Sequence, residues 1–426
     1  MNVLQRMVSG VAQAVGLQAG ISPTGDRGWS NTAIGVATTA GLYVDDTSGA
    51  KHWAVRASQE ALAGPISTLP FMVFERLEGD KRRPAREHPL FKVLHSRPNR
   101  RQTAQEFRDE QQRHLAWWRN AYAIIRPAGD GYPVGELETV HPSRVWRVER
   151  GTDGWVYYWI NRLAPATGYD VFREDDILHL RKAPLTRDGL RGVPVWESDG
   201  ETIGKALAVE QFGALYFANG GAGGGVLEHP GNFRSKEDEQ SFLEAWRAGG
   251  TGSNRHKDRL LKFGVKYSRN TVQNDEAQFL ETKKQAGYEV ASIWNMPPHR
   301  VGMLERATNN NIEQQSIEFV VYTLAPWISA WEQGATRDLL IGQDQDRFFI
   351  EFNVAGLLRG DLKTRWAAYA TGRQWGWLSV NDILRLENMN PIGEQGDVYL
   401  QPSNMQDAKS VAGTLSDPNA KDNANA

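Results

Sequence analysis

The chain has 426 residues, a formal net charge of -2 and 40% hydrophobic residues, which predicts two or three globular domains with substantial cores. Zero cysteines exclude a disulfide scaffold, a zinc site built on thiolates and a cysteine nucleophile. The near-neutral charge argues against tight binding of nucleic acid, because such affinity comes from lysine and arginine neutralising phosphates.

The first part of the chain predicts a mobile arm followed by helices. Residues 1–29 hold few core residues and end in a cluster of Ser, Pro, Gly and Asp, so we expect a mobile N-terminal arm. Nothing there approaches the roughly 20 apolar residues that span a bilayer, and we expect no membrane segment. Residues 52–69 favour a helix. Thr103 and Glu106 form a capping box for a second helix, over 104–118.

Residues 120–180 change to strand character, with turn signals between the runs, and predict a compact antiparallel β subdomain. This stretch is rich in aromatic side chains, which fit either a base-stacking platform or core and cross-strand packing. We favour core and cross-strand packing for this set, which comprises Trp146, Trp155, Tyr157, Tyr158 and Trp159.

A glycine tract follows a predicted helix over 190–219. Gly220–Gly225 is glycine except at Ala222. A phosphate-binding loop would need a lysine and a hydroxyl after the glycines, and neither is present. The tract therefore predicts a flexible hinge that leads into a small unit. We expect this unit to contain a strand at 226–228, a helix over 235–248 and a second strand at 260–265.

Residues 274–295 predict an amphipathic helix. Asn274 is a suitable N-cap, and Met296-Pro297-Pro298 ends the helix because proline lacks an amide hydrogen. Four apolar residues recur at helical spacing and are the expected packing stripe, namely Phe279, Ala286, Val290 and Ile293. We expect this stripe to leave apolar surface that a single copy of the chain would expose.

A long polar loop leads from this helix to a second one. The loop residues that could meet phosphates or offer neutral hydrogen bonds are His299, Arg300, Met303, Glu305, Arg306, Asn309, Asn310 and Asn311. The second helix runs over 312–341, and Pro326 lies inside it, so we expect a kink. A strand at 348–354 and helices at 362–369 and 380–387 follow, and 405–426 should be disordered.

The sequence gives no positive sign of an enzyme. No histidine pair has metalloprotease spacing and no serine lies in a nucleophile elbow. Asp344 with Asp346, or Asp175 with Asp176, lack neighbours that would complete a coordination shell. We therefore predict no catalytic residue, no metal and no cofactor.

The order of motifs over 52–404 resembles the portal proteins of tailed bacteriophages, in the short form of siphophages and prophages. The residues that carry the resemblance are His88-Pro89-Leu90, Arg97-Pro98-Asn99, Asn120-Ala121-Tyr122, Asp176–Leu180, Asp188-Gly189-Leu190, Asn219-Gly220, Val226-Leu227, Ala277–Glu281, Pro297-Pro298, Leu324-Ala325-Pro326, Gly360-Asp361 and Leu378–Asp382. Arg119 is a departure, since the family often has glycine before Asn-Ala-Tyr.

The resemblance implies an α+β portal fold with a β-rich wing, a long helical stem, a small α/β clip, a kinked helix and a helical crown. The implied division is a mobile arm (1–29), wing (30–189), first stem helix (190–219), clip (220–271), second stem helix (272–295), tunnel loop (296–311), kinked helix (312–342), wing strand (343–359), crown (360–404) and disordered tail (405–426). It implies a homododecameric ring at one capsid vertex of the virion, assembled in the host cytoplasm.

The same resemblance implies the partners. They are double-stranded DNA passing weakly through the channel, the large terminase, a head-tail adaptor and the major capsid protein. The implied functions are genome packaging and ejection. Two alternatives are a nuclease or ATPase of the packaging machine, which lacks a Walker motif and an acidic cluster here, and a helical scaffold without a channel. A nucleotide-hydrolysis assay distinguishes the first alternative from a portal protein, and the mass of the native particle distinguishes the second.

Overall fold

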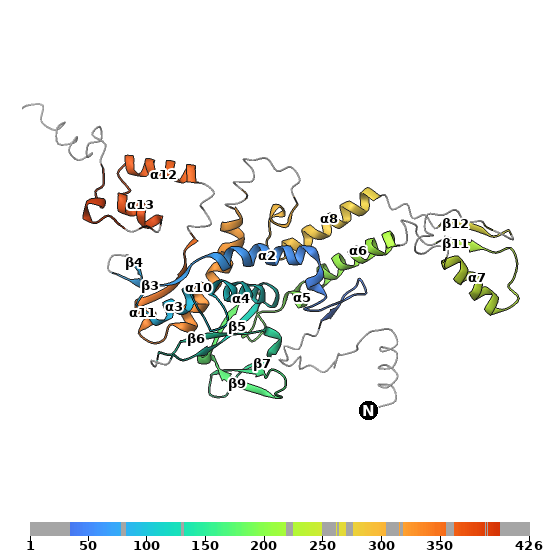
Figure 1. Cartoon of the computed structure of the whole chain (residues 1–426), viewed down its shortest axis with the longest axis horizontal. Helices are drawn as coiled ribbons and strands as arrows, with labels where there is room; N and C mark the ends of the chain where they lie inside the picture. Colours follow the sequence, from blue (N-terminus) through green and yellow to red (C-terminus); the bar gives the residue numbers. More distant parts are fainter. Residues whose placement is uncertain are drawn as a thin grey trace, which may run out of the picture. The chain divides into compact units, whose positions relative to one another are not determined.

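The computed structural model describes residues 35–77, 82–128, 132–218, 225–248, 261, 264–269, 276–303, 315, 318–354, 362–387, 389 and 391–400. The chain divides into two compact units (Figure 1). The first unit comprises Met1–Ala307 and Val321–Glu351, and the second comprises Thr308–Val320 and Phe352–Ala426. The predicted arm and tail, 1–29 and 405–426, lie outside the described residues.

Helices and antiparallel sheets alternate along the chain, as expected for an α+β fold. The α-helices are α2 (Trp53–Thr68), α3 (Pro89–His95), α4 (Ala104–Trp118), α5 (Val195–Ser198), α6 (Gly200–Ala218), α7 (Lys236–Ala248), α8 (Glu276–Ser292), α10 (Ala325–Leu339), α11 (Asp344–Arg347), α12 (Leu362–Gln374) and α13 (Val380–Leu386). The strands are β1 (Val36–Ala37), β2 (Tyr43–Val44), β3 (Phe71–Arg76), β4 (Arg82–Pro84), β5 (Asn120–Arg126), β6 (Glu136–Val140), β7 (Val145–Arg150), β8 (Val156–Asn161), β9 (Tyr169–Arg173), β10 (Ile177–Arg181), β11 (Gly225–Glu228), β12 (Lys266–Arg269) and β13 (Phe348–Phe352).

Helices α2 and α4 pack together at the centre of the first unit (Figure 1). The capping box predicted for α4 is confirmed, since the Thr103 side chain accepts from the Glu106 amide and the Glu106 carboxylate accepts from the Thr103 amide. Arg108 of α4 is buried, and its guanidinium donates to the carbonyls of Ser67 and Leu94. A buried cation is tolerated only with such partners, so this contact fixes α4 against the ends of α2 and α3.

The β-rich stretch forms two three-stranded antiparallel sheets, ordered β10-β5-β6 and β7-β8-β9. Their buried faces share one apolar cluster that includes Tyr122, Val148 and Ile160. The expectation of core and cross-strand packing is confirmed for Tyr158, which is buried, whereas Trp155 is 39% exposed and lies outside the core, with the Arg173 guanidinium of β9 4.3 Å from its ring centroid. Side chains alternate between the two faces of a strand, so neighbouring aromatic residues on β8 cannot all reach the core.

The small unit between α6 and α8 contains β11, α7 and β12. The second strand lies at Lys266–Arg269 and not at the predicted 260–265. Gly264 adopts φ +76, a left-handed conformation that strand residues do not adopt, and β12 begins after it. The predicted helix over 190–219 is also shorter, because α5 and α6 begin only after Pro194.

The second unit contains α12, α13 and a 3-10 turn. The predicted helices are confirmed, with α12 extending to Gln374. Ser379 and Asp382 form a capping box at the start of α13. Asn381 is buried and bridges to the following turn, donating to the Gly393 carbonyl and accepting from the Ile392 amide.

Candidate functional site

The candidate site is the base of the polar loop, where α8 ends and the second helix begins. Of the predicted loop residues, His299, Arg300 and Met303 are described, in and just after the 3-10 turn η5 (Pro298–Val301). The other predicted members, Glu305, Arg306, Asn309, Asn310 and Asn311, lie outside the described residues. Burial and the neighbouring Arg300 lower the pKa of His299.

Met303 is held at the loop base by a close approach of helices. A Cβ atom added at Gly287 of α8 would lie 2.6 Å from Met303 Cε and 2.6 Å from Trp53 Cζ2 of α2. Only glycine leaves room for both side chains at this point. The absence of a side chain at Gly287 therefore seats the first residues of the loop against α2 and α8.

Replacing Gly287 by valine should lower the free energy of unfolding by about 1–3 kcal/mol, because the rigid indole of Trp53 cannot yield as a methionine can. Thermal unfolding followed by circular dichroism measures this. Gly64, where an added Cβ would meet only Glu60 Oε1 at 3.9 Å, provides the control position. Equal unfolding temperatures for Gly287→Val and the wild-type chain would contradict the packing argument.

Helix α8 ends in a Schellman motif. The Met296 amide donates to the Ala291 carbonyl and the Asn295 amide donates to the Ser292 carbonyl, at 3.1 and 2.9 Å. Asn295 adopts φ 51, the left-handed conformation that this motif requires. The two prolines that follow cannot extend the helix, so the chain leaves α8 in a fixed direction.

The second helix differs from the single kinked α-helix that the sequence predicts. Phe319–Leu324 forms a π-helical turn, η6, and α10 begins at Ala325 with Pro326 in its first turn. Pro326 has no amide hydrogen for the Tyr322 carbonyl. That carbonyl accepts from Asn295 Nδ2 at 3.2 Å, and Thr323 Oγ1 donates to the Asn295 carbonyl at 2.7 Å. The two ends of the loop segment are thus joined at Asn295; the size of the kink itself stays a prediction.

Helix α10 is anchored to the β10 strand and to α4. Lys182 Nζ donates to the Pro326 carbonyl at 2.8 Å, and Asp338 accepts from the His179 amide at 2.9 Å. Trp331 Nε1 donates to Gln112 Oε1 at 2.8 Å in the core. These contacts hold the helix on the C-terminal side of Pro326 in one position.

The stem-packing residues are only partly as predicted. Ala286 and Val290 are buried within the chain, and Phe279 lies against α6, where a Cβ at Gly213 would be 2.5 Å from its Cζ. The expectation of exposed apolar surface is wrong for Val290, because α2 and α6 pack against that face of α8, whereas Ile293 is only partly buried. On the described parts of α6 and α8, the large apolar side chains that are exposed are Phe212, Leu215 and Leu280.

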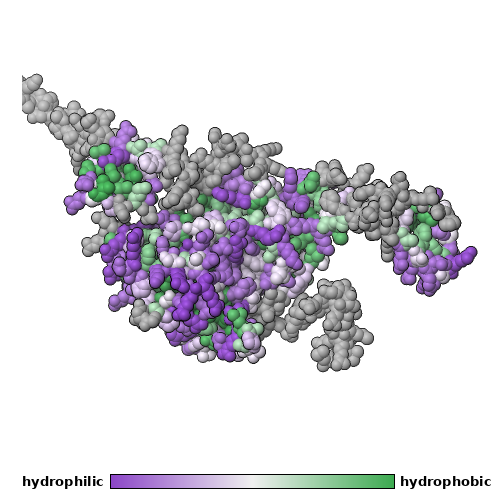
Figure 2. Space-filling model, viewed as in Figure 1, coloured by the Kyte–Doolittle hydropathy of each residue, from purple (hydrophilic) through white to green (hydrophobic). Residues whose placement is uncertain are grey.

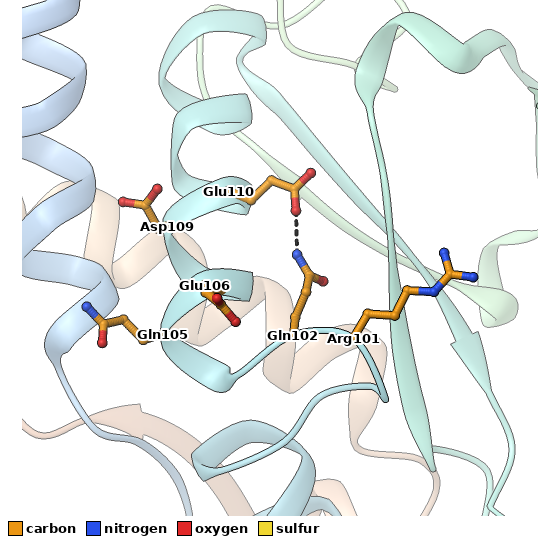
Figure 3. Close-up of a pocket in the computed structure, with 6 residues that line it drawn as sticks. All are labelled: Arg101, Gln102, Gln105, Glu106, Asp109 and Glu110. Atoms are coloured by element: carbon orange, nitrogen blue, oxygen red, sulfur yellow. Dashed lines mark hydrogen bonds between the residues drawn. The ribbon is translucent and has the colours of Figure 1, made fainter.

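A surface hollow of about 420 Å³ lies at the start of α4 (Figure 3). The lining residues are Arg101, Gln102, Gln105, Glu106, Asp109 and Glu110. Their carboxylates are already engaged: Glu106 in the capping box, Asp109 with Arg113, and Glu110 with Gln102. These side chains therefore serve the start of α4 and its local contacts, and we assign the hollow no chemistry.

Within the described parts of the chain, no group of three or more His, Asp or Glu side chains is placed to hold a metal ion. Among the helices that the structure describes, none combines the length and the apolar run needed to cross a membrane.

Sequence reasoning missed the roles of Gly287, Asn295 and Thr323. Asn295, just before Met-Pro-Pro at the end of an amphipathic stripe, carries a readable signal for a left-handed helix end. No sequence signal links it to Tyr322 or Thr323, because that contact joins residues 27 and 28 positions apart.

Comparisons with known proteins identify the family. Residues 53–388 match the family described as phage portal protein. The chain is 30% identical to the portal protein of Enterobacteria phage HK97 over 345 residues, 78% of this chain and 77% of that protein. It is 35% identical to a probable portal protein of Streptomyces phage phiC31 over 239 residues, 55% of this chain and about half (52%) of that protein.

Solved structures share the fold. The chain aligns with a subunit in the neck of an empty gene transfer agent particle at a TM-score of 0.58 and 19% identity, covering 81% of this chain and 92% of that one. An HK97-family phage portal protein from Corynebacterium diphtheriae aligns at a TM-score of 0.54 and 15% identity, covering 76% and 98%. The chain therefore belongs to the phage portal protein family.

Proposed function

We propose that this chain forms a homododecameric ring at one vertex of the phage capsid, through which the genome is packaged and later ejected. The observation that carries the proposal is the family match over 53–388, on a chain whose two neighbouring helices α6 and α8 bracket the small β11-α7-β12 unit. One of the related solved structures is a gene transfer agent neck computed with C12 symmetry, which supports twelve subunits.

Exposed apolar side chains support self-association. Phe212 and Leu215 on α6 are 48% and 56% exposed, and Leu280 on α8 is 56% exposed. Trp366 and Trp377 of the second unit are exposed by 64% and 62%. Figure 2 shows other hydrophobic residues at the surface of the region of α12 and α13 and of the region of α6 and α8. Exposed apolar patches mark interaction sites, and ring subunits would cover them with copies of the same chain.

The segment roles follow from the same proposal. The β-rich first part of the chain (30–189) with residues 343–359 acts as the wing, α6 and α8 as the stem, residues 220–271 as the clip, and residues 360–404 as the crown. The clip is the docking surface for the large terminase and the head-tail adaptor, and the wing faces the major capsid protein. Such a protein acts as a channel and docking ring in the virion, assembled in the host cytoplasm, and not as an enzyme.

The loop 299–311 lines the narrowest part of the channel in this proposal. Its basic residues Arg300 and Arg306 would meet phosphates, Glu305 offsets them, and Asn309–Asn311 offer neutral hydrogen bonds. This balance suits DNA that must slide, because tight phosphate contacts would retain it.

Deleting residues 304–308 should leave ring assembly intact and reduce the amount of DNA packaged or retained in capsids. Met303 is kept, since it packs at Gly287 and Trp53. Replacing residues 304–308 by three lysines should instead slow DNA passage, because the lysines would bind phosphates. The slowing should be stronger at low salt, since the release of counterions from DNA is then more favourable. Packaged DNA per capsid and infectivity at several salt concentrations are the measurements.

A replacement of residues 304–308 by five alternating glycines and serines is the matched control, because it keeps the loop length and removes the native side chains. Normal packaging and infectivity in both the deletion and the lysine variant would contradict the channel position of this loop. Loss of rings in the deletion variant alone would instead assign the loop to subunit contact.

A further inference from the structure

Asn295 stands at a position that glycine normally fills. Among the described residues, Arg119 and Asn295 are the non-glycine residues with positive φ. A left-handed C-terminal position costs glycine least, and asparagine is the usual second choice. Unlike glycine, an asparagine there also offers a side-chain amide that can form hydrogen bonds.

The side chain is used at the π-helical turn. Asn295 Nδ2 donates to the carbonyl of Tyr322, the residue four positions before Pro326. In an α-helix that carbonyl would receive the amide hydrogen of residue 326, which proline lacks. The side-chain amide of Asn295 therefore supplies a hydrogen-bond donor to a carbonyl that Pro326 cannot serve.

We propose that Asn295 is a positioning residue, whose side-chain amide replaces the donor absent at Pro326 and so holds the Phe319–Leu324 turn in π-helical register against the end of α8. This inference concerns the fold at the loop base and does not depend on the channel function.

Register at this turn decides which residues face the core. Thr323 and Leu324 are 2% and 0% exposed, whereas Val321 and Tyr322 are 51% and 66% exposed. Converting a π turn to an α turn moves the residues on its N-terminal side by about 100° around the helix axis and about 1.5 Å along it. Such a shift would move the chain that enters η6, while the hydrogen bond from Thr323 to the Asn295 carbonyl holds the C-terminal part of the turn.

The C-terminal side of the turn has its own support. Lys182 Nζ donates to the Pro326 carbonyl and lies 5.0 Å from the centroid of the Trp327 ring. Because α10 is held in this way, loosening at Asn295 is expected to be confined to η6 and to the chain that enters it. The residue thus acts on the exit of the loop, and not on α10.

A double-mutant cycle between Asn295 and Pro326 tests the proposal. Asn295→Gly keeps the left-handed backbone and removes only the side-chain donor, so the chain should fold. Pro326→Ala restores the backbone donor for Tyr322. Hydrogen exchange, measured by mass spectrometry on the full chain, reports on amides of 318–325, with peptides of α8 as the internal reference.

Asn295→Gly should speed exchange in 318–325 about threefold, the effect of losing one partly solvated hydrogen bond. In the Pro326→Ala background the same substitution should change exchange less than twofold, since the carbonyl then has a backbone partner. Asn295→Asp, which keeps the shape but places a carboxylate against the carbonyl, should act at least as strongly as Asn295→Gly.

Unchanged exchange in Asn295→Gly and Asn295→Asp would overturn the proposal. An equal effect of Asn295→Gly on exchange in the Pro326 and Pro326→Ala backgrounds would also overturn it, because Asn295 would then serve only to end α8. Hydrogen exchange does not depend on DNA packaging. A negative result would therefore contradict the role of Asn295 without contradicting the proposed channel function.

Discussion

Replacing Trp331 by alanine should lower the free energy of unfolding of the first unit by about 3–5 kcal/mol, the cost of emptying a large buried aromatic site. Trp331 is 1% exposed and lies edge-on to Phe71, with ring centroids 5.8 Å apart. Its indole also donates to Gln112, whose side chain is fully buried. Urea denaturation followed by circular dichroism measures the change.

Trp331→Phe separates packing from hydrogen bonding. It keeps most of the ring and removes the indole N–H, so it should cost about 1–3 kcal/mol through the unpaired Gln112 oxygen and the smaller ring. Leu163→Ala is the surface control, because Leu163 is 65% exposed and should change stability by less than about 0.5 kcal/mol. An alanine effect at Trp331 no larger than at Leu163 would contradict the assignment of this residue to the core.

Acidification from pH 7.5 to pH 5 should destabilise the first unit by about 4 kcal/mol through two buried histidines, each contributing about 2 kcal/mol. Burial lowers the pKa of His114 to about 3, with His141 adding to the effect. Burial, together with Arg181, Arg337 and Arg191, lowers the pKa of His179 well below its usual value.

The sign follows from the unfolded state, in which both histidines titrate near pH 6.5. Below that pH the unfolded chain binds more protons than the folded chain. The stability is therefore present above pH 6.5 and is lost as the pH falls toward the lower folded-state values. Unfolding free energies from urea titrations at several pH values between 5 and 7.5 provide the measurement.

The hydrogen bonds of His179 explain why it stays neutral. The Gly192 amide donates to Asn120 Oδ1, which fixes that atom as an acceptor. His179 Nε2 lies 3.1 Å from the same oxygen and so carries the hydrogen, while Nδ1, 3.1 Å from the Tyr158 hydroxyl, accepts. Adding a proton at Nδ1 would remove this acceptor and bury a charge.

His179→Gln provides the control for this prediction. The variant should be less stable at pH 7.5, yet its free energy of unfolding should fall less steeply as the pH is lowered. The difference between the two slopes should reach up to about 1.4 kcal/mol per pH unit, the value for one proton. The same pH slope in the variant and the wild-type chain would show that His179 does not titrate on unfolding.

Local chemistry made several elements predictable from sequence. The Thr103–Glu106 pair specified the start of α4, and Met296-Pro297-Pro298 specified the end of α8, because caps and prolines act within a few residues. The family resemblance, carried by short motifs spread over the chain, was confirmed by the match over 53–388.

Long-range packing explains where prediction failed. The stripe on α8 gave the correct periodicity, but periodicity does not say whether α2 and α6 or a second copy of the chain covers it. Val290 proved fully buried within the chain. Pro326 predicted a disturbed helix, but its π-helical form and the hydrogen bond that Tyr322 accepts from Asn295, 27 residues earlier, had no local signal.

The most direct test of the proposed ring is a cryo-electron microscopy reconstruction of the purified, assembled full-length chain. We predict a closed ring of identical subunits around an open axis, with α6 and α8 of neighbouring copies in contact and residues 299–311 at the narrowest point. A particle without a closed ring, or a ring with residues 299–311 on its outer wall, would contradict the proposal.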